Sequence, residues 1–159
     1  GTHVDVPRHM LDDDRHISDY PLESFAGRGC LLDVRGEVLI RWKPDYKEQV
    51  QEGDIVVIYT GFDRRFGDKG YFTDHPVLER ELAEFLVERN VRAVGMDLPS
   101  PDRPPFEVHK LLFRAGIPII ENLTNLQALA EVEGFELFAF PLKIRAEASP
   151  VRVVASCPA

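Results

Sequence analysis

The chain has 159 residues, a length that fits one domain whose hydrophobic core needs no disulfide bonds. Hydrophobic residues make up 44% and charged residues 29%, which is typical of soluble globular proteins and excludes a disordered chain. With 19 Lys and Arg against 27 Asp and Glu, the formal charge is −8, so nucleic-acid binding through a basic face is not expected. The longest apolar runs are too short to cross a bilayer, and no membrane partner is expected.

Short apolar runs, several of them rich in β-branched residues, alternate with helical patterns along the chain. These runs predict strands over residues 30–34, 38–40, 55–59, 91–96 and 117–120. Between the third and fourth runs, apolar side chains from Leu78 to Leu86 recur at three- and four-residue steps, which predicts an amphipathic helix. We expect this helix to start near Pro76, with Asp74 as its cap.

The rest of the chain predicts two more helices, the first ended by Gly116, and a pair of strands joined as a hairpin across residues 146–150. The helices are expected over residues 106–115 and 123–130, and the strands over 135–144 and 151–155. Strands that alternate with helices, with paired strands at both ends, predict an α/β fold with a mixed sheet flanked by helices. We expect a single domain, residues 1–159.

The first residues contain a His-x-Asp pattern that is typical of metal sites. In an extended segment, His3 and Asp5 project from one face, while Val4 and Val6 pack on the other. Imidazole and carboxylate groups are ligands for zinc or manganese. The pair alone is a weak indication, because an exposed, frayed N-terminus gives the same pattern.

A second pair of candidate residues lies far along the chain. His109 lies on the helix predicted over 106–115, and Glu121 directly follows the strand predicted over 117–120. Open α/β sheets place functional groups at the carboxyl ends of their strands, and a buried carboxylate needs a cation as its partner. The alternatives are a solvent-exposed strand end for Glu121 and a hydrogen-bonded core histidine for His109.

These residues belong to a larger set of motifs that covers nearly the whole chain. In order, the motifs are residues 1–9, 59–61, 71–76, 95–100, 108–109, 119–123 and 140–142. They resemble the cyclase family, which includes bacterial kynurenine formamidases and isatin hydrolases and has the signature His-x-Gly-Thr-His-x-Asp-x-Pro-x-His. The first histidine of that signature would fall before Gly1. We therefore expect that the chain lacks an N-terminal segment carried by family members.

The resemblance implies a swivelling β/β/α architecture with a metal site at one end of the sheet. It makes His3, Asp5, His109 and Glu121 ligands of one or two zinc ions, with manganese as the alternative and Asp5 able to bridge two ions. His9 matches the last histidine of the signature, which the resemblance implies is the catalytic acid and base.

The activity implied by this resemblance is metal-dependent hydrolysis of an amide, formamide or cyclic amide C–N bond through metal-activated water. N-formylkynurenine is the first substrate to consider, within the class of small molecules. The alternative is a catalytically incomplete metal-binding or scaffold member of the family, and a ring-closing cyclase is a third possibility. Family members usually assemble as homodimers or larger homo-oligomers.

Several other residues have two possible roles. Three polar side chains either line the mouth of a site or cap loops, namely Asp97, Ser100 and Asp102. His75 is expected at the start of the amphipathic helix, with a catalytic role as the alternative. The aromatic-rich residues 62–72 form either a wall for a flat substrate or peripheral core. The two cysteines, Cys30 and Cys157, have no motif spacing, which indicates a reducing compartment and favours the cytoplasm.

Overall fold

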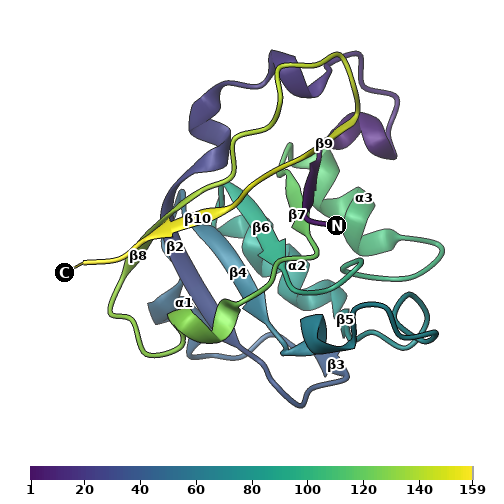
Figure 1. Ribbon diagram of the computed structural model, residues 1–159. Coiled ribbons are helices and arrows are strands. Elements are labelled where there is room, and N and C mark those ends of the chain that lie inside the picture. Colours follow the sequence, from purple (N-terminus) through teal and green to yellow (C-terminus); the bar gives the residue numbers. More distant parts are fainter. Residues whose placement is uncertain (159) are drawn as a thin grey trace.

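The computed structural model describes residues 1–158, which form an eight-stranded sheet and a small two-stranded sheet (Figure 1). In spatial order the eight strands are β10 (Val154–Ser156), β8 (Phe135–Phe138), β2 (Ala26–Asp33), β4 (Ile55–Tyr59), β6 (Ala93–Met96), β7 (Ile119–Glu121), β1 (His3–Asp5) and β9 (Ala148–Pro150). The central strands β2, β4, β6 and β7 are parallel, and the strands at both edges pair antiparallel. The mixed sheet predicted from the sequence is confirmed.

Helices cover one face of this sheet, where α2 and α3 lie behind the strands in Figure 1. The helices are α1 (Tyr46–Gln49), α2 (Arg80–Glu88) and α3 (Glu107–Arg114). Short 3-10 turns connect other elements: η1 (Pro7–His9), η2 (Ile17–Asp19), η3 (Leu22–Phe25), η4 (Phe62–Arg65) and η5 (Leu126–Leu129). No helix within residues 1–158 is long and apolar enough to span a membrane.

The central strands are buried on both faces, which explains their continuous apolar sequences. All five residues of β4 are buried, and alternate side chains belong to two different core clusters. Val56 packs in the cluster on the helical face, whereas Val57 packs in the opposite one with Ile120 and Leu126. A parallel strand covered on both faces has this composition.

The amphipathic helix was predicted too early in the chain. Val77 and Leu78 form β5 (Val77–Leu78), which pairs in parallel with β3 (Leu39–Ile40), and α2 begins only at Arg80. The expected cap at Asp74 and the helix-start role of His75 are therefore wrong. A partner strand 38 residues earlier in the chain decides the conformation here, since Leu39 aligns with Val77.

The predicted C-terminal hairpin is only half right. Strands β8 and β10 do pair antiparallel, with Leu137 opposite Ala155. The connection is not a turn across 146–150, however, because Ala148–Pro150 forms β9 and pairs with β1 at the other edge of the sheet. This pairing satisfies the outer backbone groups of β1, which would otherwise be an open edge.

Candidate metal centre

The candidate ligands of the first motif lie on β1, and its extended backbone determines where they point. Val4 and Val6 are fully buried in the cluster on the face opposite α3, as the alternation predicts. His3 and Asp5 project from the other face. The antiparallel pairing of β1 with β7 aligns His3 with Glu121. Sequence-distant residues are thus brought together by strand register.

Three of the predicted ligands form one compact group. His3 Nε2 lies 3.4 Å from Asp5 Oδ2 and 3.4 Å from Glu121 Oε2. One ligand atom from each of the three residues lies within 4.8 Å of the others. The two carboxylates are buried, with Asp5 2% and Glu121 5% exposed, while His3 is partly exposed. Of these three side chains, His3 is therefore the one that solvent reaches.

His109 reaches the same group from α3. Its Nε2 lies 3.3 Å from Glu121 Oε1, the oxygen that does not face His3. Its Nδ1 lies 2.6 Å from Asp102 Oδ1. The other three predicted ligands thus lie around the carboxylate of Glu121, and the role of all four residues in binding a metal remains a prediction.

In this cluster, carboxylates lie close to imidazoles, and burial and these contacts shift the pKa values of both. The hydrogen bond to Asp5 raises the pKa of His3 to about 9, against the opposing effect of partial burial. Burial lowers the pKa of His109, but hydrogen bonds to Asp102 and Glu121 outweigh burial and bring the pKa to about 9. Burial raises the pKa of the Glu121 carboxyl above its usual range. The metal-free cluster therefore retains protons that a divalent cation would displace.

The residues present fit a divalent cation by two observations. Asp5 Oδ1 is buried and has no hydrogen-bond partner among the described residues, so one oxygen of the carboxylate is free for a ligand. Tetrahedral ligands about 2.0–2.2 Å from a zinc ion lie roughly 3.3–3.6 Å from one another. The separations of 3.4 Å between His3 Nε2 and the two carboxylate oxygens match that spacing.

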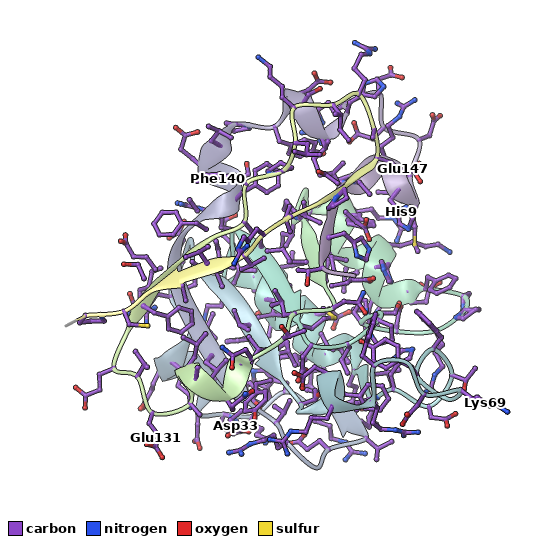
Figure 2. All side chains as sticks on the ribbon, viewed as in Figure 1. His9, Asp33, Lys69, Glu131, Phe140 and Glu147 are labelled. Atoms are coloured by element: carbon purple, nitrogen blue, oxygen red, sulfur yellow. The ribbon has the colours of Figure 1, made fainter. Side chains whose placement is uncertain are left out.

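His9, the predicted acid and base, lies outside this group. It ends η1, just after β1, and its exposed ring contacts Glu147, with Nδ1 3.2 Å from Oε1 (Figure 2). The backbone supports this contact, because the N–H of Val6 donates to the carbonyl of Glu147 at 3.1 Å. His9 is thus placed beside the ligand-bearing strand, with Nε2 free of the Glu147 contact.

Two of the three polar residues in the loop before α3 stabilise loops, which is one of the two roles that the sequence left open. Asp97 binds the loop after β4, since it accepts hydrogen bonds from the backbone N–H groups of Thr60 and Gly61 at 2.9 and 2.6 Å. Ser100 donates to the carbonyl of Asp102 at 2.7 Å, which also stabilises the loop. Asp102 instead contacts the ring of His109, a partnership that sequence spacing alone did not predict.

The aromatic-rich loop connects to the cluster through a residue that the sequence reasoning missed. Tyr71 stacks on Phe62 at 5.4 Å and donates its hydroxyl hydrogen to Asn122 Oδ1 at 2.8 Å. The hydroxyl of Thr2 donates to the carbonyl of the same Asn122 at 2.6 Å. Asn122 directly follows Glu121 and adopts a left-handed conformation with φ of 56°. Its place within the motif at 119–123 was the available signal.

Comparisons with known proteins identify the family of this chain. The sequence model of the family described as "Putative cyclase" matches residues 1–103. Kynurenine formamidase of Bacillus thuringiensis (strain Al Hakam) is 31% identical over 159 residues, which covers 97% of this chain and 74% of that protein. Kynurenine formamidase of Bacillus anthracis gives the same identity and coverage.

Solved structures with a similar fold are also known. Isatin hydrolase A from Labrenzia aggregata, bound to benzyl benzoate, superposes with a TM-score of 0.84 at 27% identity, covering 98% of this chain and 72% of that chain. A potential metal-dependent hydrolase with cyclase activity gives a TM-score of 0.80 at 31% identity, covering 98% and 77%. A mixed α/β sheet that carries a His/Asp/Glu cluster and matches these enzymes defines a protein of the hydrolase class. The chain belongs to the cyclase family.

Proposed function

We propose that this chain is a metal-dependent hydrolase that cleaves an amide, formamide or cyclic amide C–N bond. The observation that carries the proposal is the compact group of His3, Asp5 and Glu121, in which a buried oxygen of Asp5 has no hydrogen-bond partner among residues 1–158. Net addition of water breaks the C–N bond and gives a carboxylate and an amine. Zinc is the first metal to test and manganese the second, because imidazole and carboxylate ligands suit both.

The ligand set would hold the ion between β1, β7 and α3. His3, Asp5 and Glu121 would bind directly, and His109 would complete the set from the opposite side of Glu121. When bound, such an ion supplies Lewis acidity, which makes water more acidic and stabilises negative charge on the substrate carbonyl oxygen.

His9 would move the proton that hydrolysis requires. Its Nδ1 faces Glu147, which leaves Nε2 to accept a proton from water and to donate one to the leaving nitrogen. An imidazole suits both transfers near neutral pH. The exposed position of His9 at the end of η1 allows a substrate to reach it.

N-formylkynurenine is the best single substrate for this proposal. The relatives named kynurenine formamidase support it, and the isatin hydrolases support cyclic amides as the second choice. The aromatic side chains of residues 62–72 would suit the ring of either substrate, because Phe66 and Phe72 are exposed beside the Tyr71–Asn122 contact. We also propose that the active form is a homodimer or larger homo-oligomer.

Hydrolysis of N-formylkynurenine and isatin, followed by absorbance, tests this proposal. The chain is assayed as purified, after removal of metal with a chelator, and after addition of zinc or manganese. Activity that disappears with the metal and returns with it is expected. The control is an Asp12→Ala variant, because Asp12 is an exposed carboxylate in the same N-terminal stretch as the proposed ligand Asp5. Absence of turnover in every metal-loaded sample contradicts the proposal and favours a non-catalytic scaffold.

A further inference from the structure

Asp102 carries a buried carboxylate, 8% exposed, in the loop that leads into α3. Its two oxygens contact different groups. Oδ2 accepts hydrogen bonds from the backbone N–H groups of Val108 and His109, at 2.6 and 3.4 Å. Oδ1 lies 2.6 Å from His109 Nδ1. One oxygen therefore binds the first turn of the helix, while the other faces the imidazole ring.

The ring of His109 is also enclosed by aromatic side chains. Phe106 and Phe113 both meet it edge-on, with ring centroids 5.7 Å away. Asp102 occupies the Nδ1 side, and Nε2 points to Glu121 Oε1 at 3.3 Å. Only Nε2 therefore faces the candidate metal centre.

We propose that Asp102 is a positioning residue that fixes the orientation and tautomer of His109 for metal binding. The inference rests on the proposed function. When Nδ1–H donates to Asp102, the lone pair of Nε2 is available on the side of Glu121. A carboxylate in this position also makes the imidazole a stronger ligand, as in other carboxylate–histidine–metal arrangements.

A purely structural role for Asp102 makes a different prediction. If the carboxylate only caps α3 through Oδ2, then asparagine at position 102 serves nearly as well, because Asn and Asp are comparable caps. An amide cannot replace the charged acceptor at Nδ1 with equal strength. The Asp102→Asn variant therefore separates the two roles.

Zinc affinity, measured by competition with a chromophoric chelator, is the readout, and circular dichroism confirms that each variant is folded. We expect Asp102→Asn to bind zinc about 10- to 100-fold more weakly than the wild-type chain. Asp54→Asn is the matched control, since Asp54 is also buried and accepts from a backbone N–H and a cationic side chain. Its affinity is expected to stay within about threefold of wild type.

The outcomes distinguish this inference from the proposed function. A wild-type chain that binds neither zinc nor manganese contradicts the proposed function and this inference with it. Wild-type binding that Asp102→Asn leaves unchanged contradicts the inference alone.

Nitrogen-15 NMR of the histidine rings covers the case in which Asp102→Asn does not fold. In the zinc-loaded wild-type chain, we expect His109 to carry hydrogen on Nδ1 and zinc on Nε2. Zinc on Nδ1, or a His109 ring without zinc, overturns the inference.

Discussion

Buried carboxylates lie at both ends of the parallel strands, with Asp54 at one end and Asp5 and Glu121 at the other. The two ends differ in how completely these carboxylates are paired. Asp54 precedes β4 and lies 2.5 Å from Arg28 Nη1, and it also accepts the backbone N–H of Gln51 at 2.8 Å. At the far end, the ionic partners of Asp5 and Glu121 are imidazoles, at distances of 3.3–3.4 Å. Within residues 1–158 neither contacts a Lys or Arg.

The difference indicates what each group is for. The Asp54 pair is complete without an added ion, as expected of an interaction that stabilises the fold. Within the part of the chain that the structure describes, the Asp5–Glu121 group leaves Asp5 Oδ1 buried without a hydrogen-bond partner, and burying an unpaired charged atom is unfavourable. A ligand would complete such an arrangement, and a divalent cation is the ligand that suits these donors.

The largest effect on turnover, apart from loss of the ligands, is expected at His9. His9→Ala should lower kcat about 100-fold or more and leave the zinc content unchanged, because the ring contacts Glu147 and not the ligand group. Steady-state kinetics with elemental analysis of the same samples measures both quantities. Parallel loss of zinc would instead make His9 a ligand.

A substitution at Asp54 should instead affect the stability of the fold. Asp54→Asn should reduce the free energy of unfolding by about 1–3 kcal/mol, because Arg28 and the Gln51 N–H lose a charged acceptor. Zinc affinity should be unchanged. Urea denaturation of the metal-free chain gives the first value. If this variant binds zinc poorly, the contrast between the two ends does not hold.

A smaller effect is expected from pH on the free energy of unfolding of the metal-free chain. The pKa values of His3 and His109 are both raised to about 9, and that of Glu121 is also raised, so the folded chain binds more protons than the unfolded chain. The stability that the two histidines contribute is fully present below the ordinary histidine pKa of about 6.5 and is lost as pH rises through about 9.

Thermal unfolding of the metal-free chain between pH 6 and 10 measures this dependence. Repeating the series with His3→Gln should make the decline shallower, because one of the shifted groups is absent. Stability that rises over this range would contradict the assigned charge states.

The sequence predicted those parts of the site that depend on local periodicity. Alternation along a strand placed His3 and Asp5 on one face, and a strand end placed Glu121. The contact between Asp102 and His109 was not predicted, because it depends on how the loop folds back onto the first turn of α3. Spacing along the chain contains no information about that path.

The errors in the predicted fold also arise from contacts between residues that are distant in sequence. Residues 77–78 were expected in a helix but pair with β3, and residues 148–150 were expected in a turn but pair with β1. In both cases a strand distant in sequence supplies the hydrogen bonds. Local propensity predicts neither partner, whereas β4, whose sequence is apolar throughout, was predicted with the observed bounds.

Metal content tests the central claim most directly. The wild-type chain, Asp5→Ala and the control Asp12→Ala are loaded with zinc or, in separate samples, with manganese, freed of excess ion and analysed for bound metal. We predict stoichiometric zinc in the wild-type and Asp12→Ala chains and its loss in Asp5→Ala, because Asp5 supplies the buried oxygen that has no hydrogen-bond partner within residues 1–158. Absence of stoichiometric zinc and manganese from the wild-type chain, or full retention by Asp5→Ala, would contradict the metal centre assigned to β1 and β7.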